Sequence, residues 1–272
     1  MLHLQFYNRD TNAGELVQAL EYNPQRDIAD LLTEEERQRL EQHWQERAKR
    51  GFWNSEIGSL WDTQQGLKYI KTTFSLHDAV AVSLSSGTTL FRPEILEKHR
   101  DSAVGVSLET ADGLVLVQRR KEGLLAGGLL DASASGLCIV ENGTLSLEKA
   151  IMNKMKRELH LEAWELEYLL PTGVHRGYDY GSSMVTFKAK LNKPFEEILY
   201  GDVSGVIGIP HDDLPAYLVR HLTPERDLID DGYATFLAGL EEDVFQETVT
   251  MLLRQGCIIE FGSLLEGESR IR

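Results

Sequence analysis

Cysteine is scarce in this chain, which has only Cys138 and Cys257 among its 272 residues. Two cysteines in apolar stretches form neither a disulfide framework nor a cysteine-based zinc site, so we expect two reduced, buried thiols and a cytoplasmic protein. Long apolar runs are missing too, which argues against a membrane-spanning helix. Residues 1–6 lack a basic region followed by an apolar core, and a signal peptide is therefore not expected.

Basic residues are in the minority as well. The chain has 28 Lys and Arg against 43 Asp and Glu, and its formal net charge is −15. Nucleic-acid binders and polybasic membrane anchors need a positive surface, so we expect neither nucleic acid nor a membrane as a partner. An acidic protein that handles phosphate groups needs local basic side chains or metal ions to counter its own field.

Residues 1–95 are expected to form a helix-rich N-terminal extension or small domain. Thr33 and Glu36 make the capping-box pattern that begins a helix, and Gly51 is a typical stop after it. A polar connection at residues 85–101 marks the boundary to the next part of the chain.

Residues 96–225 are expected to form the main domain, followed by a helical C-terminal segment at residues 226–272. Its clearest feature is a hairpin with an Asp112-Gly113 turn. A helix is predicted at residues 146–161, with Ala150, Ile151, Met155 and Leu159 as its inward face. Strands and further helices surround it in the sequence. Extended segments are expected at residues 67–74, 103–108, 114–118, 129–140, 167–174, 183–191 and 203–209. This order predicts an α/β (α+β) fold, a mixed sheet between helices in an α/β/α sandwich.

Two glutamates on the predicted helix are candidates for chemistry. Glu158 and Glu162 are four residues apart, so on a helix that reaches Glu162 their carboxylates share one face. A divalent cation such as Mg²⁺ would relieve their repulsion. The plainer interpretation is a solvated helix face, with Lys154 and Glu158 as an ordinary i,i+4 pair.

Aromatic residues in loops pose a choice between ligand stacking and packing. Tyr178 lies in a glycine-bounded turn and is a candidate substrate-binding residue, although packing is the commoner role of such a tyrosine. Trp53 and Trp61 pose the same choice, and for them packing is favoured.

The hairpin, the Gln118-Arg119-Arg120 strand end and the following helix together resemble the Nudix hydrolase family. The family's box reads Gly, five residues, Glu, seven residues, Arg-Glu-apolar, any residue, Glu-Glu, any residue, Gly, apolar. Anchored on Arg157-Glu158-Leu159, this chain has Gly143 at the first glycine and Glu162 at the second of the paired glutamates. It departs from the box at Lys149, Leu161 and Trp164, where the family has Glu, Glu and Gly.

The wider layout resembles the divergent Nudix branch that cleaves UDP-glucose and UDP-galactose. The resemblance implies that Glu158 and Glu162 bind Mg²⁺ or Mn²⁺ and take part in catalysis. It implies a base or further metal ligand at Asp202, for which a turn residue is the plainer interpretation. Arg119 or Arg120 would neutralise the diphosphate, and plain surface charge is the alternative for both. Arg157 is a further candidate for binding the substrate.

We therefore expect a metal-dependent hydrolase of a nucleoside diphosphate linked to another group, with a nucleotide sugar favoured, yielding a nucleoside monophosphate and a phosphorylated product. The alternative is a non-catalytic module that binds a nucleotide, which Lys149 and Leu161 favour because both replace carboxylates. A third interpretation is chemistry like that of isoprenoid-diphosphate isomerases, which would need Cys138 in the site. The resemblance also allows a homodimer.

Overall fold

The computed structural model describes residues 2–7, 22–63, 66–87, 90–98, 102–122, 126–177, 183–222 and 227–262. Within these ranges, none of the helices has the length and apolar character needed to cross a lipid bilayer.

Nine described strands form the main sheet, and their order is mixed in direction. The path runs β11-β6-β5-β10-β9-β1-β12, with β7 beside β6 and β8 beside β5. β10 pairs parallel with β5 and antiparallel with β9. The strands are β1 (His3–Tyr7), β5 (Ser102–Glu109), β6 (Leu114–Arg119), β7 (Leu130–Asp131), β8 (Ala134–Leu137), β9 (Leu166–Gly177), β10 (Ser183–Leu191), β11 (Gly205–Pro210) and β12 (Ile258–Gly262).

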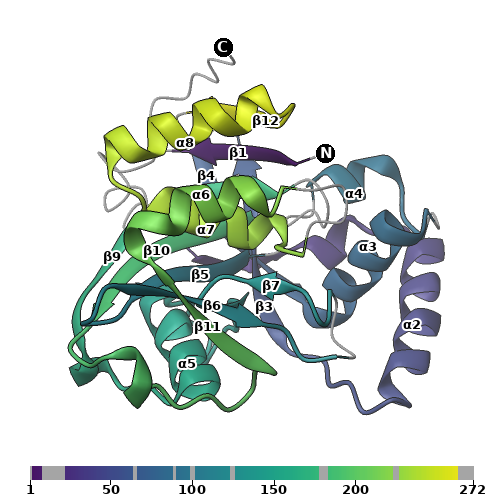
Figure 1. Cartoon of the computed structure of the whole chain (residues 1–272). Coiled ribbons are helices and arrows are strands. Elements are labelled where there is room, and N and C mark those ends of the chain that lie inside the picture. Colours follow the sequence, from purple (N-terminus) through teal and green to yellow (C-terminus); the bar gives the residue numbers. More distant parts are fainter. Residues whose placement is uncertain are drawn as a thin grey trace.

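Helices cover both faces of this sheet, as Figure 1 shows. One face carries α5 (Leu147–Leu159), and the other carries α6 (Leu214–Arg220), α7 (Asp230–Gly239) and α8 (Glu242–Arg254). Short 3₁₀ turns join the elements: η2 (Ala163–Glu165), η3 (Phe195–Glu197) and η4 (His211–Asp213). The expected mixed α/β fold with helices on both sides of the sheet is confirmed.

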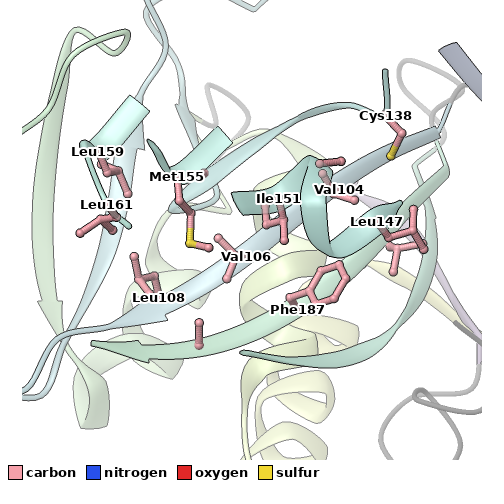
Figure 2. Packing of buried hydrophobic residues seen from close by; sticks show 14 of the residues in the cluster. Val104, Val106, Leu108, Cys138, Leu147, Ile151, Met155, Leu159, Leu161 and Phe187 are labelled. Atoms are coloured by element: carbon pink, nitrogen blue, oxygen red, sulfur yellow. The ribbon is translucent and has the colours of Figure 1, made fainter. Parts of the chain in front are cut away.

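Helix α5 is held in place by one apolar face. Its side chains Ile151, Met155 and Leu159 are fully buried against Val106 and Phe187 of the sheet (Figure 2). Side chains spaced three or four residues apart lie on one side of a helix, so this stripe turns the remaining faces of α5 outward. The apolar face predicted from the sequence is confirmed, and it fixes which residues of α5 can reach a ligand.

A second, smaller unit, which we call the N-terminal lobe (residues 22–98), has its own sheet in the order β2-β4-β3. Its elements are β2 (Tyr22–Asp27), η1 (Ile28–Leu31), α2 (Glu34–Ala48), β3 (Glu56–Thr63), β4 (Gly66–Thr73), α3 (Phe74–Ser86) and α4 (Pro93–Lys98). Helix α2 begins with the predicted capping box of Thr33 and Glu36. The lobe joins the main sheet where Gly58 N–H donates to the Cys138 carbonyl at 3.1 Å.

Three expectations from the sequence need correction. The central helix, expected to reach residue 161, ends at Leu159, because His160 adopts a left-handed conformation with φ of 54°. Residues 258–262, expected in a helical tail, form strand β12 beside β1. The aromatic segment at residues 52–62, expected to be a loop, contains most of β3.

Candidate functional site

A cleft of about 510 Å³ lies between the N-terminal lobe and the main sheet. This volume suits a ligand of nucleotide size. The lobe contributes side chains from residues 50–57 together with Phe74, and the rest come from β6, β8, α5 and the segment before β11. The polar lining residues are Arg50, Ser55, Gln118, Arg120, Lys121, Ser135, Lys154, Arg157, Glu158 and Asp202.

Arg120 reaches the cleft from the end of β6 and is fixed by a buried carboxylate. Its guanidinium donates to Asp131 Oδ2 at 2.7 Å, and Ser135 Oγ donates to the same oxygen at 2.7 Å. Burial raises the pKa of Asp131 above its usual value, and Arg120 opposes that rise. The pair therefore presents a pre-positioned guanidinium to the cleft, because Asp131 is fully buried and cannot move away from it.

Arg157 connects two carboxylates at the other side of the cleft. Its guanidinium contacts Glu158 Oε1 at 3.0 Å and Asp202 Oδ2 at 3.1 Å. The segment that carries Asp202 is docked on the end of α5, because Gly201 N–H donates to the Glu158 carbonyl at 2.9 Å. The structure thus brings Glu158, Arg157 and Asp202, three of the predicted site residues, into one cluster.

Glu158 is a buried carboxylate with few hydrogen-bond donors. Besides Arg157, the one donor to Glu158 among the described residues is Ser135 N–H, in a long contact at 3.4 Å. Burial raises the pKa of Glu158 above its usual value, and the charges of Lys154 and Arg157 offset the rise only in part. Perturbed carboxylates of this kind gather at functional sites.

Lys154 is a cleft residue that the sequence analysis missed. It lies one turn before Glu158 on α5, and its side chain crosses Gly136 of β8. The expected ion pair between Lys154 and Glu158 does not form in the described part of the chain. A signal was present in the sequence, because a small-residue strand next to a helix leaves room for a long side chain between them.

The N-terminal lobe supplies an aromatic wall. Phe52 and Phe74 stack with ring centroids 6.4 Å apart and 9° between their planes, and the Arg47 guanidinium lies 4.7 Å above the Phe52 ring. Trp53, next to this stack, lines the cleft with 78% of its surface exposed. The packing role favoured for Trp53 is therefore wrong, since a ring this exposed packs against little of the protein.

Arg119 and Glu162, two other predicted site residues, lie outside the cleft lining. Successive side chains of a strand point to opposite faces, so Arg119 points away from Arg120 and donates to the Gly128 carbonyl at 2.6 Å. Glu162 follows the end of α5 and pairs at 2.7 Å with Lys156 on the surface. The shared helix face expected for Glu158 and Glu162 does not exist, because the helix ends between them.

The remaining predicted positions do not contribute to the cleft. Cys138 is fully buried in the core under α5, as its apolar neighbours suggested. Leu161 is also fully buried in that core. Tyr178 lies outside the described residues.

The side chains at the cleft do not fit a Mg²⁺ site. Mg²⁺ is bound by carboxylates together with water and phosphate oxygens. Among the described residues, no three His, Cys, Asp or Glu side chains gather closely enough to hold a metal ion. The charged neighbours of Glu158 are Lys154, Arg157 and Asp131. Asp131 is already paired with Arg120, and the two cations would repel a bound metal ion.

Comparisons with known proteins give similarity in structure only. No family model and no curated protein sequence matches the chain. The Nudix domain of Shewanella oneidensis NrtR, in complex with ADP-ribose, is 18% identical with a TM-score of 0.40, covering 58% of this chain and 94% of that one. The Nudix hydrolase RenU from M. smegmatis is 16% identical with a TM-score of 0.36, covering 56% and 87%.

A third similar structure is DR0079 from Deinococcus radiodurans, which is 17% identical with a TM-score of 0.38, covering 56% of this chain and 83% of that one. The identities and TM-scores of all three are low, and no argument about activity rests on them.

Proposed function

We propose that the cleft binds a small molecule in which a nucleoside diphosphate is linked to another group, a nucleotide sugar being the favoured example. The observation that carries this proposal is the local excess of positive charge in an acidic chain. Five cationic side chains line the cleft against two carboxylates, Glu158 and Asp202. The five are Arg50, Arg120, Lys121, Lys154 and Arg157. Guanidinium and ammonium groups are the side chains that neutralise phosphate oxygens.

The non-phosphate part of the ligand also has suitable partners. Trp53 offers an exposed ring on which a base can stack. Gln118 lines the same cleft and is 3% exposed, and its side-chain Oε1 has no partner in the described part of the chain. A base with hydrogen-bond donors would satisfy such an acceptor.

The Nudix box can also be aligned so that its final glycine falls directly after the end of α5. In that alignment the resemblance supports a binding role. In that pattern a glycine and an apolar residue follow the paired glutamates. The left-handed residue after α5 is His160, and the buried apolar residue after it is Leu161. This register begins four residues earlier than the one anchored on Arg157-Glu158-Leu159, and the three carboxylate positions that lie within α5 fall on Lys154, Arg157 and Glu158. Two of the three are then cations.

Hydrolysis of the same ligand is the second candidate function, and the raised pKa of buried Glu158 favours it. Glu158 would accept a proton from a water molecule whose oxygen forms a new bond to phosphorus. The bond from that phosphorus to the bridging oxygen would break, giving a nucleoside monophosphate and a phosphorylated product. The metal dependence expected from the sequence applies to hydrolysis of the ligand and not to its binding.

The binding proposal is tested by calorimetric titration of the whole chain with UDP-glucose, ADP-ribose, UDP and uridine. We expect a dissociation constant in the micromolar range for at least one diphosphate compound, and at least about tenfold weaker binding of uridine, which lacks the charged groups. Equal binding of UDP and uridine, or no binding of any diphosphate compound, would contradict the proposal.

The hydrolase candidate is tested by following phosphate release, after phosphatase coupling, from the same panel with and without Mg²⁺ or Mn²⁺. Turnover that disappears in Glu158→Gln, while UDP binding by that variant persists, would support it. A ligand that binds and stays intact would leave the protein as a binding module.

A further inference from the structure

Lys154 has a position in the cleft that depends on the glycine beneath its side chain. The backbone of Gly136 under it has a φ of 149°, a conformation that favours glycine. A Cβ at that position would lie 2.7 Å from Lys154 Cε and would overlap the ammonium group as well. Gly136 therefore makes room for the lysine, which lies across β8 with its charge in the cleft.

No residue that the structure describes pairs with the Lys154 ammonium and so accounts for its position. Within the described residues it forms neither a hydrogen bond nor an ion pair. Burial lowers the pKa of Lys154, Arg157 lowers it further, and Glu158 opposes both. A partly buried charge without a partner is costly, so the arrangement is suited to a negatively charged group that arrives from outside.

Two further polar atoms of the same cleft lack partners in the described part of the chain. They are Oε1 of Gln118 and Nε of Arg120, and both are buried. Arg120 keeps Asp131 on another of its nitrogens, so the side chain stays fixed while its Nε has no partner among the described residues. Gln118 and Arg120 lie at the end of β6, and Lys154 lies on α5. All three residues line the same cleft.

We propose that Lys154 and Arg157 take the place of a divalent metal ion, so that the cleft binds the diphosphate of its ligand directly and without a metal. This inference rests on the proposed function, since it assumes that a diphosphate is the group bound. The cations supply the charge that a metal would supply; Arg157 contacts Glu158 directly, and the charge of Lys154 favours the ionised form of Glu158. A metal ion added to this cluster would have to displace or approach two positive charges.

The inference predicts that binding of UDP and UDP-glucose survives removal of metal ions. Titrations in EDTA and in Mg²⁺ should give dissociation constants that are equal within about twofold, or tighter in EDTA because Mg²⁺ competes for the diphosphate in solution. Binding that occurs only with Mg²⁺ would overturn this inference and leave the proposed function standing. Absence of binding under both conditions would overturn the two together.

Variants of Lys154 test the residue itself. Lys154→Gln should weaken UDP binding in EDTA by at least about tenfold, the usual effect of a lost charge-assisted hydrogen bond. In Lys154→Glu the weakened binding should be partly restored by Mg²⁺, because a carboxylate then joins Glu158. The matched control is Lys156→Gln, two residues further along α5 and paired with Glu162 outside the cleft.

Lys156→Gln should change UDP binding by less than about twofold. Equal affinities of Lys154→Gln and the wild type would overturn the inference. If either Lys154 variant fails to fold, Arg157→Gln gives the same test, because the Arg157 side chain is half exposed and makes little contact with the core. It should weaken UDP binding in EDTA by a similar factor, and unchanged binding would count against the inference in the same way.

Discussion

Glu36 in the N-terminal lobe and Glu158 at the cleft have similarly low solvent exposure, 3% and 6%, yet their pKa values shift in opposite directions. Glu158 lies deeper in the protein, and the two also differ in their hydrogen-bond donors. Burial by itself would raise the pKa of Glu36, but hydrogen bonds from Arg92 and Thr33 lower it to about 2. For Glu158, burial raises the pKa and its neighbours do not reverse the shift.

Part of the difference lies in the donors that surround each carboxylate. Glu36 accepts from the backbone N–H groups of Thr33 and Arg92, both at 2.8 Å, and from Arg92 Nε at 3.1 Å. Glu158 has Arg157 and one long backbone contact. A carboxylate that is fully hydrogen-bonded stabilises the fold, whereas one left short of donors is available for a ligand or a proton.

The largest expected effect is a loss of stability on replacing Glu36. Glu36→Ala leaves the cap of α2 and Arg92 without their acceptor, and should reduce the free energy of unfolding by about 2–3 kcal/mol in urea denaturation. Glu35→Ala is the matched control on the same helix turn, because Glu35 is exposed and pairs only with Arg39. Its cost should be under about 0.5 kcal/mol. Equal losses of unfolding free energy in Glu36→Ala and Glu35→Ala would contradict the structural role of Glu36.

The next effect belongs to the cleft. Trp53→Ala should weaken binding of UDP by about tenfold, the usual contribution of one base stacked on an aromatic ring, with little change in unfolding temperature. Trp164→Ala is its control, since Trp164 is as exposed, at 75% against 78%, and lies outside the cleft. Titration of both variants decides the point, and equal affinities would mean that Trp53 does not contact the base.

The two glutamates should also give opposite dependences of stability on pH. The lowered pKa of Glu36 contributes stability that is present above its unfolded value near 4.5 and lost as the pH falls towards about 2. The raised pKa of Glu158 works the other way, with stability present below the unfolded value and lost as the pH rises through the folded one.

Unfolding of Glu158→Gln at several pH values measures the second effect. Compared with the wild type, the variant should gain stability as the pH rises above the unfolded value near 4.5. A variant that is less stable than the wild type at pH 8 would show that Glu158 is a structural residue like Glu36.

The smallest expected effect is at Glu162. Its carboxylate is 44% exposed and pairs with Lys156 on the surface, so Glu162→Gln should alter stability by less than about 0.5 kcal/mol and leave UDP binding unchanged. A large loss of binding in the titration would restore Glu162 to the site and contradict the geometry described above.

Much of the fold follows from local sequence patterns. The capping box at Thr33, the Asp112-Gly113 turn and the apolar stripe of α5 each depend on neighbouring residues, and each is found where the sequence predicts it. Strands β1 and β12 were missed because their pairing joins the two ends of the chain, which no local pattern reveals. The end of α5 was misjudged because a left-handed residue at His160 is uncommon for a side chain other than glycine or asparagine.

The sequence predicted the cluster of Arg157, Glu158 and Asp202 but not the other residues of the cleft. Arg157, Glu158 and Asp202 lie together because Gly201 docks on the end of α5. Glu162 was placed with them only by assuming a longer helix. The roles of Lys154 and Trp53 were misjudged, because their place in the cleft depends on how the N-terminal lobe and β8 face the helix, although the small residues of β8 were a signal for Lys154.

The central claim is that the cleft holds a diphosphate through its own cations. The most direct measurement is a crystal structure of the whole chain with UDP-glucose, grown in the presence of EDTA. The account predicts diphosphate oxygens within about 2.7–3.2 Å of Lys154 Nζ and the Arg157 guanidinium, with the uracil ring against Trp53. A ligand bound outside the cleft, or a diphosphate that orders only when Mg²⁺ joins it to Glu158, would contradict it.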